Sequence, residues 1–166
     1  VYVHFGAYGT AGLTTTGELV WSTRFPYDSQ HGNGGSPILY DDLLILSCDG
    51  YDTAFVVALD SETGEVRWKA PRQNPISQAY STPLLITVGD RDVLISIGAF
   101  RTNALDPDTG DELWQVGYPD GFSNVPAPVF SRDHGLVFIT TGFQQPALLA
   151  VRVDGDGDVT PTHVAW

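Results

Sequence analysis

The chain has 166 residues, 42% of them hydrophobic, and carries a net charge of −12, with Lys69 as its single lysine. An acidic chain of this kind is poorly suited to bind nucleic acid or an anionic membrane surface. Its apolar stretches are far shorter than a membrane span. The single Cys48 excludes an internal disulfide framework and matches no metal-binding spacing, so we interpret it as a buried strand residue.

Short strand-like segments separated by turn residues run through the whole chain, and tryptophans mark their repetition. The tryptophans stand at positions 21, 68, 114 and 166, which are 47, 46 and 52 residues apart. Prolines repeat with a similar spacing: Pro37, Pro83 and Pro128 each precede an apolar segment. A period of this size in a chain with almost no helical pattern indicates a radial array of β-sheets.

In chain order, each repeat is predicted to contain four strands, and the chain opens on a second strand at 1–5. The later second strands are nearly continuous apolar runs, as expected where both faces of a sheet are covered, and lie at 43–46, 93–97 and 136–139. The third strands lie at 55–59, 103–105 and 147–151. The predicted fold is all-β, a partial β-propeller of about three and a half four-stranded antiparallel blades.

One turn recurs before the tryptophan, with the pattern Ala-Leu-Asp-x-x-Thr-Gly-x-x-x-Trp at 58–68 and 104–114 and a worn copy at 13–21. The glycine supplies a positive φ, and the aspartate caps backbone N–H groups of the turn. We expect each indole to be buried between successive sheets and to stack near its own turn. The residues assigned this structural role are Trp21, Asp60, Gly64, Trp68, Asp106, Gly110 and Trp114.

These landmarks divide the chain into parts of one propeller domain that is incomplete at both ends. Residues 1–25 are a half blade with strands two to four, 36–72 and 82–117 are blades, and 127–166 are a blade with a seven-residue insertion. Three and a half blades do not close a ring. We therefore expect a fragment whose missing blades belong to the same parent chain and which self-associates in isolation.

The motif at 58–68 and 104–114 resembles the tryptophan-docking motif of the quinoprotein (pyrroloquinoline-quinone-like) β-propeller repeat family, and the resemblance covers essentially the whole chain. That family contains quinone-dependent dehydrogenases. It also contains propellers without a cofactor, among them outer-membrane-assembly lipoproteins and uncharacterised secreted propellers. The resemblance implies a parent ring of about eight blades and a periplasmic or extracellular location.

The resemblance leaves two classes of function open. A non-catalytic binding or assembly scaffold without a cofactor is favoured, because the adjacent paired cysteines and calcium-liganding residues of quinone-dependent alcohol dehydrogenases have no recognisable counterpart here. The alternative is part of a pyrroloquinoline-quinone-dependent dehydrogenase with calcium beside the quinone. The sequence has no Gly-x-Ser-x-Gly or His-Glu-x-x-His motif. No catalytic, cofactor-binding or metal-binding residue is assigned.

Three polar segments of the sequence have features of ligand-binding loops. Residues 154–158 alternate aspartate and glycine like half of a calcium loop, but the later glycine and glutamate of an EF-hand are missing, so a glycine-rich hairpin connection is the better interpretation. Residues 31–36 could be mistaken for a phosphate cradle, but no helix follows and no lysine is near, so we interpret them as an adaptable loop that enters a first strand. Residues 48–52 place two acids beside a turn, where we expect solvated side chains.

In a propeller, the loops from each fourth strand to the next first strand share one face with the loops between strands two and three. Here these loops carry aromatic and amide side chains, Phe122 and Gln145 among them. We therefore predict a protein or glycan partner at this face, and neither nucleic acid nor a membrane span. The candidate binding residues are His31, Asn33, Asp49, Asp52, Gln78, Tyr80, Arg101, Asn124 and Gln144.

Overall fold

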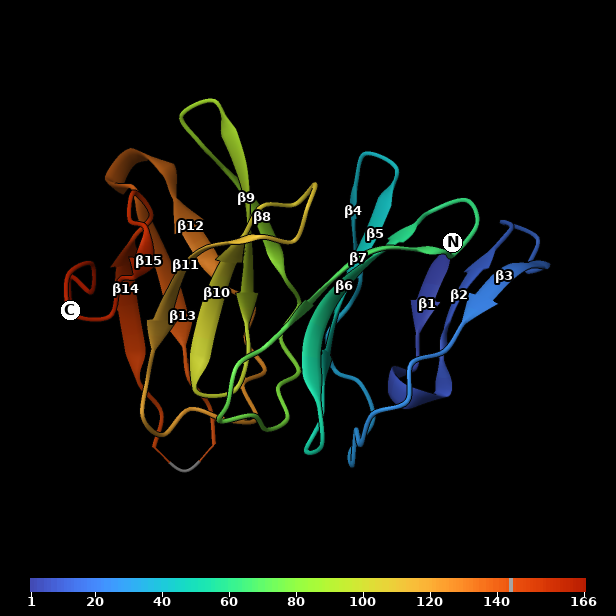
Figure 1. Cartoon of the computed structure of the whole chain (residues 1–166), viewed down its shortest axis with the longest axis horizontal. Helices are drawn as coiled ribbons and strands as arrows, with labels where there is room; N and C mark the ends of the chain where they lie inside the picture. Colours follow the sequence, from blue (N-terminus) through green and yellow to red (C-terminus); the bar gives the residue numbers. More distant parts are fainter. Residues whose placement is uncertain (144) are drawn as a thin grey trace.

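The computed structural model describes residues 1–143 and 145–166, and these residues form sheets that stand side by side along the chain (Figure 1). Their helical elements are two short 3₁₀ turns, η1 (Gly6–Tyr8) and η2 (Arg132–His134). No helix in the described ranges is long and apolar enough to cross a membrane. The all-β prediction is confirmed.

Four sheets can be followed within the described residues. The first contains β1 (Tyr2–His4), β2 (Thr10–Leu13) and β3 (Leu19–Thr23). The second contains β4 (Ile38–Tyr40), β5 (Leu43–Asp49), β6 (Ala54–Asp60) and β7 (Val66–Pro71). The third contains β8 (Leu84–Val88), β9 (Arg91–Ile97), β10 (Arg101–Leu105) and β11 (Glu112–Gly117), and the fourth contains β12 (Val129–Ser131), β13 (Leu136–Thr140) and β14 (Leu148–Arg152). Within each of these sheets, strands that follow one another in the chain pair antiparallel, which is the arrangement of a partial β-propeller.

A register shift precedes the tryptophan in each of the first three sheets. The shift falls between Ala58 and Leu59 where β6 meets β7, and between Ala104 and Leu105 where β10 meets β11. The first sheet has the same irregularity after Gly12. A bulge bends a strand and increases its twist. The recurring bulge therefore changes the direction of the tryptophan-bearing strand next to the tryptophan itself.

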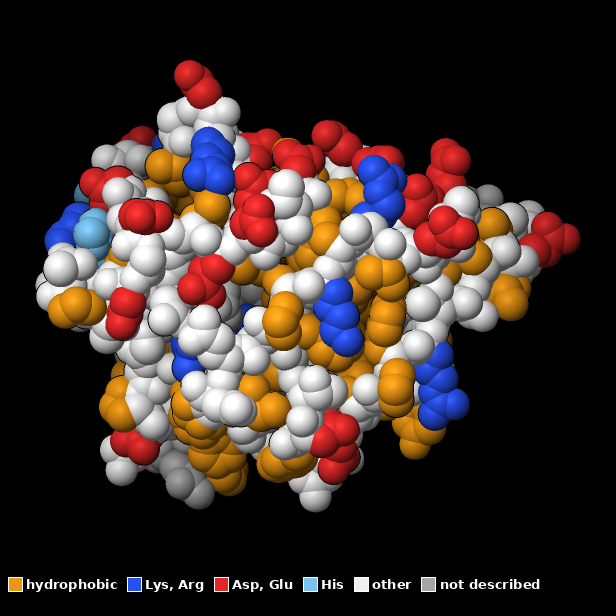
Figure 2. Space-filling view, viewed as in Figure 1, with side chains coloured by type: hydrophobic (Ala, Val, Ile, Leu, Met, Phe, Trp, Pro, Cys, Tyr) orange, Lys and Arg blue, Asp and Glu red, His pale blue; other side chains and the backbone are white. Residues whose placement is uncertain are grey.

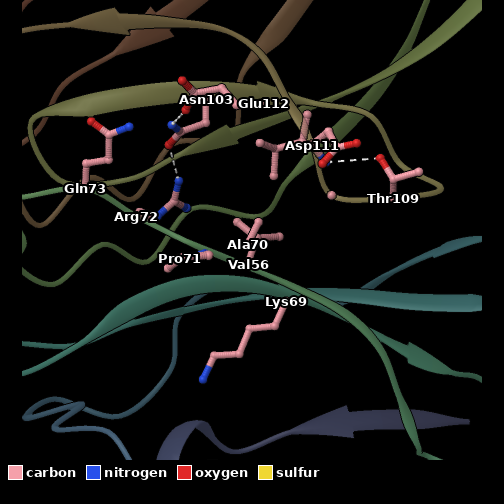
Figure 3. A pocket seen from close by; sticks show the side chains of 12 residues that line it. Val56, Lys69, Ala70, Pro71, Arg72, Gln73, Asn103, Thr109, Asp111 and Glu112 are labelled. Atoms are coloured by element: carbon pink, nitrogen blue, oxygen red, sulfur yellow. Dashed lines mark hydrogen bonds between the residues drawn. The ribbon is translucent and has the colours of Figure 1, made fainter.

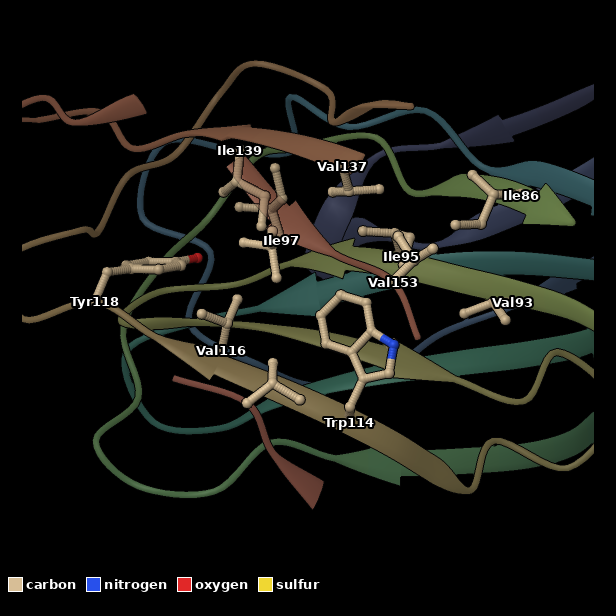
Figure 4. Close-up of a cluster of buried hydrophobic side chains, with 13 residues drawn as sticks. Ile86, Val93, Ile95, Ile97, Trp114, Val116, Tyr118, Val137, Ile139 and Val153 are labelled. Atoms are coloured by element: carbon tan, nitrogen blue, oxygen red, sulfur yellow. The ribbon is translucent and has the colours of Figure 1, made fainter. Parts of the chain in front are cut away.

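The apolar core lies between the sheets. Trp21 packs with residues of the second sheet, and Trp68 packs with residues of the second and third sheets. Trp114 is only 1% exposed and lies in a cluster shared by the third and fourth sheets, where Figure 4 shows its ring beside Ile95 and Val153. Because the faces of each sheet are covered by the neighbouring sheets, packing between sheets accounts for much of the buried apolar area.

The expectation that each tryptophan stacks near its own turn is wrong. The indole N–H of Trp21 donates to the Ser61 carbonyl at 3.0 Å, and its ring lies over Gly64 in the turn of the next sheet. Trp68 lies over Gly110 in the same way. The reason is geometric: a strand side chain projects out of the sheet plane, so it reaches the neighbouring sheet rather than the hairpin of its own strand.

The seven-residue insertion also differs from expectation, because it is more than a longer hairpin connection. Its strand β15 (Gly157–Asp158) pairs in parallel with β11 of the preceding sheet. The Val159 amide then donates to the Gln115 carbonyl at 2.9 Å, and the Thr160 hydroxyl accepts from the Gly117 amide at 2.8 Å. The insertion thus gives the third sheet a fifth strand and ties two sheets together through the main chain.

The insertion coincides with a change at Trp114. The indole N–H of Trp114 is buried and has no hydrogen-bond partner among the described residues, unlike those of Trp21 and Trp68. At the corresponding place, the fourth sheet carries the insertion instead of the Asp-x-x-Thr-Gly turn. A buried donor without a partner costs about 1–3 kcal/mol, so the third docking junction is less complete than the first two.

Candidate functional site

The two edges of the sheet array differ in chemistry. The long loops that leave the fourth strands, at 24–37, 72–83 and 118–128, lie along the lower edge in Figure 1, together with the turns after β5 and β9. The upper edge holds the turns that carry Asp60 and Asp106. Figure 2 shows acidic side chains along this upper edge. We call the lower edge, defined by those long loops and turns, the loop edge.

Asn124 ties three segments of the loop edge together. Its side chain is fully buried, and its Nδ2 donates to the carbonyls of Gly98 at 2.8 Å and Gly121 at 3.2 Å. Its Oδ1 accepts from the Gly142 amide at 2.7 Å. Both ends of the amide are therefore engaged within the protein. The sequence placed Asn124 among candidate binding residues, and the structure places it beneath the surface as a support for the loops.

Gln78 and Tyr80 belong to the same support. Gln78 is 3% exposed, donates from Nε2 to the Ser123 hydroxyl at 2.9 Å, and accepts from the Ser77 hydroxyl at 2.6 Å. The Tyr80 amide donates to the Asn124 carbonyl at 2.8 Å. The Tyr80 hydroxyl is buried without a hydrogen-bond partner among the described residues, and burial raises its pKa.

Above this support, three phenylalanines from three different loops pack together; Phe143 is exposed, and Phe100 and Phe122 are partly buried. The ring centroids of Phe100 and Phe122 are 6.1 Å apart, and those of Phe122 and Phe143 are 5.5 Å apart. The Phe143 side chain is 57% exposed. We call these three residues the phenylalanine patch. Sequence reasoning singled out only Phe122, because the three residues are far apart in the chain and no spacing rule links them.

The backbone beneath the patch adopts an uncommon conformation. Phe100 has a φ of 64° and Ser123 a φ of 52°, in the left-handed region that bulky residues rarely adopt. Hydrogen bonds hold both residues: the Phe100 amide donates to the Gly121 carbonyl at 2.5 Å, and the Ser123 amide donates to the Gln78 carbonyl at 2.8 Å. Backbone strain of this kind persists where the surrounding structure enforces it and is frequent at functional sites.

Asp49, expected beside a solvated turn, is instead buried, so that expectation is wrong. It is 4% exposed and forms an ion pair with Arg72, whose Nε lies 2.6 Å from its Oδ1. Arg72 reaches across to the third sheet, where Nη1 donates to Asn103 at 2.7 Å and Nη2 to the Ser96 hydroxyl at 2.8 Å. Burial raises the pKa of the Asp49 carboxyl, and the Arg72 guanidinium opposes that shift. The sequence offered no signal for Arg72, because its partners lie far from it in the chain, Asp49 in the second sheet and Asn103 and Ser96 in the third.

The other candidate residues are spread over the loop edge. His31 is exposed, and the Asn33 side chain donates to the Gly35 carbonyl. Asp52 is exposed and accepts from the Asp28 amide at 2.7 Å. Arg101 donates to Gln115 and to the Asn74 carbonyl, each at 2.8 Å. Gln144 lies outside the described residues.

A separate groove of about 270 Å³ runs between the second and third sheets. Figure 3 shows Arg72 pointing toward Asn103, which donates to Glu112 at 2.7 Å, whereas Lys69 points away. The Lys69 ammonium lies 3.6 Å from the centre of the Phe55 ring. The polar groups of the groove are thus largely bonded to one another, so the groove is part of the junction between the two sheets.

Cys48 is buried as expected, and burial raises the pKa of its thiol to about 12. Among the described residues, no group of three or more His, Cys, Asp or Glu side chains is placed to hold a metal ion. In the segment 154–158, the Asp158 carboxylate accepts from both the amide and the hydroxyl of Thr160. This carboxylate organises the insertion.

Several solved structures share the fold. BamB from Moraxella catarrhalis superposes with a TM-score of 0.66 at 18% identity, over 90% of this chain and 45% of that chain. The quinohemoprotein alcohol dehydrogenase ADHIIG from Pseudomonas putida HK5 gives 0.68 at 15% identity, over 99% and 32%. The corresponding enzyme from Comamonas testosteroni gives 0.68 at 14% identity, over 99% and 32%. This chain therefore spans less than half the length of each.

No curated protein matches the sequence. A family model does match, over residues 7–160, and its description is outer membrane protein assembly factor BamB. The match includes both good copies of the docking turn and every strand of the described residues except β1. Together with the propeller sheets and the docked tryptophans, it shows that the chain belongs to this family of pyrroloquinoline-quinone-like propeller repeats.

Proposed function

We propose that the chain is part of a non-catalytic propeller that acts outside the cytoplasm as a binding or assembly scaffold, and that it holds a protein partner at the loop edge. The observation that carries this proposal is the phenylalanine patch, held at the surface by loops that Asn124 joins. An ordered aromatic surface binds a partner at low entropic cost. The family description, an assembly factor, agrees with such a role.

The polar chemistry of this region supports a scaffold more than a catalyst. The Arg72 guanidinium is neutralised by Asp49, and the Arg101 guanidinium donates to Gln115 and to a carbonyl. A residue that acts on a quinone or a substrate needs free polar atoms directed at it. The side chains of Asn124 and Gln78 are likewise bonded within the protein, whereas the Tyr80 hydroxyl and the Arg101 Nε are buried without a partner among the described residues. Dehydrogenase function remains the alternative, because quinohemoprotein alcohol dehydrogenases share the fold.

Site-specific cross-linking tests the scaffold role. A photoreactive phenylalanine analogue is placed at position 143 in the phenylalanine patch or at position 62 on the opposite edge, both of which are exposed. We expect discrete cross-linked proteins from position 143 and none from position 62. Equal cross-linking from both edges would contradict the proposal that the partner binds at the loop edge.

Calorimetric titration with pyrroloquinoline quinone and calcium chloride tests the alternative. For a scaffold we expect no saturable heat and no dye-linked oxidation of alcohols. Stoichiometric binding at micromolar or lower concentration, together with alcohol oxidation, would replace the scaffold by the dehydrogenase.

A further inference from the structure

We propose that the phenylalanine patch binds an extended protein segment in which apolar side chains stand next to a cationic one. This inference rests on the proposed function, because it gives a chemistry to the partner of the loop edge. It adds the exact place of contact, the rings of Phe100, Phe122 and Phe143, and the kind of segment that fits them.

The rings are held in place before any partner arrives. Each comes from a different loop, and the loops are joined by backbone hydrogen bonds, such as those from the Tyr118 amide to the Phe100 carbonyl at 2.9 Å and from the Phe143 amide to the Phe122 carbonyl at 3.3 Å. Asn124 adds side-chain hydrogen bonds beneath them. Phenylalanine has few rotatable bonds, so fixed backbone leaves little side-chain entropy to lose on binding.

The surroundings of the patch favour a polypeptide over a glycan. A sugar presents many hydroxyl groups, which need free donors and acceptors near the stacking ring. The amides of Asn124 and Gln78, which support the patch, are buried and bonded within the protein. The phenyl rings have no polar atom of their own. The exposed Phe143 ring and the partly exposed Phe100 and Phe122 rings offer apolar area, which matches apolar side chains of a protein segment.

The charge near the patch favours a cationic side chain in the partner segment. Asp120 is exposed two residues before Phe122. The nearby Arg101 guanidinium donates from its two terminal nitrogens to Gln115 and the Asn74 carbonyl, and its Nε is buried. Phenyl faces also attract cations, an arrangement that Lys69 and Phe55 show within this chain. A lysine or arginine beside the apolar side chains of the partner would therefore be attracted to the patch.

Fluorescence anisotropy with defined probes tests the inference on the full chain. The first probe is a labelled flexible peptide in which two leucines, one phenylalanine and two arginines are embedded in glycine and serine. The second replaces the arginines by glutamates, the third replaces the apolar residues by serines, and the fourth is chitohexaose. We expect the first peptide to bind at least about tenfold more tightly than the other probes.

Variants locate the binding. Phe143→Ser removes an exposed ring and should weaken binding of the first peptide about tenfold, whereas Val66→Ser, a matched change at an exposed apolar residue on β7, should leave it unchanged. Asp120→Asn should weaken binding of the arginine peptide about threefold and leave a lysine-free, arginine-free version unaffected. Equal binding to wild type and Phe143→Ser, or tighter binding of chitohexaose, would overturn the inference.

Amide chemical-shift mapping distinguishes binding at the phenylalanine patch from binding elsewhere on the loop edge and from binding at the opposite edge. Perturbations at 98–101, 121–123 and 142–143 on addition of the first peptide support the patch. Perturbations confined to the loop around His31 and Asn33 would refute the patch while the loop edge stayed the binding surface. Perturbations confined to the turns with Asp60 and Asp106 would refute both the patch and the proposed function.

Discussion

The indole nitrogen of Trp68 donates a hydrogen bond to the carbonyl oxygen of Pro107 at 3.0 Å, which joins β7 to the docking turn of the next sheet. Trp21 has the same relation to Ser61. In both pairs the ring also covers the turn glycine. Each docking pair therefore combines apolar burial with a hydrogen bond at the junction of two sheets, where a repeat protein is held together by contacts between neighbours.

The first prediction concerns this junction. Trp68→Ala removes a ring that is 8% exposed and leaves a cavity between the second and third sheets. We expect the free energy of unfolding to fall by about 3–5 kcal/mol, as measured by urea denaturation. Val66→Ala, an exposed site on the same strand, serves as the control and should change it by less than about 0.5 kcal/mol. A loss below about 1 kcal/mol for Trp68→Ala would show that the docking pair contributes little.

The second prediction separates backbone strain from steric fit. Gly110 and Gly89 both have positive φ, 78° and 62°, but a methyl group at Gly110 would lie 2.5 Å from the Trp68 ring, whereas nothing lies within 4 Å of one at Gly89. Both alanine variants carry the strain, and only Gly110→Ala also displaces the tryptophan. We expect Gly110→Ala to destabilise the protein by about 2 kcal/mol more than Gly89→Ala. Equal melting temperatures for the two variants would contradict this.

The repeat, the strands and the buried tryptophans could be predicted from sequence because each depends on local pattern: apolar runs, turn residues and a fixed spacing. The direction in which a tryptophan docks could not, since Trp68 and Gly110 belong to different repeats. The parallel pairing of β15 with β11 has no local signal for the same reason. At the candidate site, Arg72 depends on contacts with residues of distant strands and the phenylalanine patch on contacts between distant loops, which spacing along the chain does not reveal.

The third prediction concerns the buried ion pair. Arg72→Leu leaves the Asp49 carboxylate buried without its cation, so we expect a loss of about 3–5 kcal/mol in the free energy of unfolding. The double variant Asp49→Leu, Arg72→Leu removes both charges and should be more stable than Arg72→Leu alone. Chemical denaturation of the two variants and the wild type at neutral pH measures the difference. If the double variant is less stable than Arg72→Leu, the pair does not act as a charge-compensated unit.

The fourth prediction concerns pH. His4 is partly buried, its Nδ1 lies 2.8 Å from the Thr10 hydroxyl, and burial lowers its pKa from 6.5 to about 4. The folded state therefore disfavours the protonated ring, while the unfolded chain binds a proton near pH 6.5. The contribution of His4 is fully present above pH 6.5 and is lost as pH falls toward about 4, by roughly 2–3 kcal/mol. His4→Gln should flatten the stability profile in this window, and His31→Gln, at an exposed site, should not.

The last prediction concerns the support beneath the phenylalanine patch. Asn124→Ala would leave the Gly121 carbonyl and the Gly142 amide without their side-chain partner and the Gly98 carbonyl with the Tyr118 hydroxyl alone. Because this loss is confined to the loops, amide hydrogen exchange at 98–101, 121–123 and 142–143 should become at least about tenfold faster, equivalent to about 1.4 kcal/mol of local opening, while β9 and β13 keep their protection. Asn33→Ala, which removes a hydrogen bond within a single loop, is the control and should leave these three segments unchanged. If exchange instead accelerates uniformly over loops and strands, Asn124 stabilises the whole array and does not specifically order the loop edge.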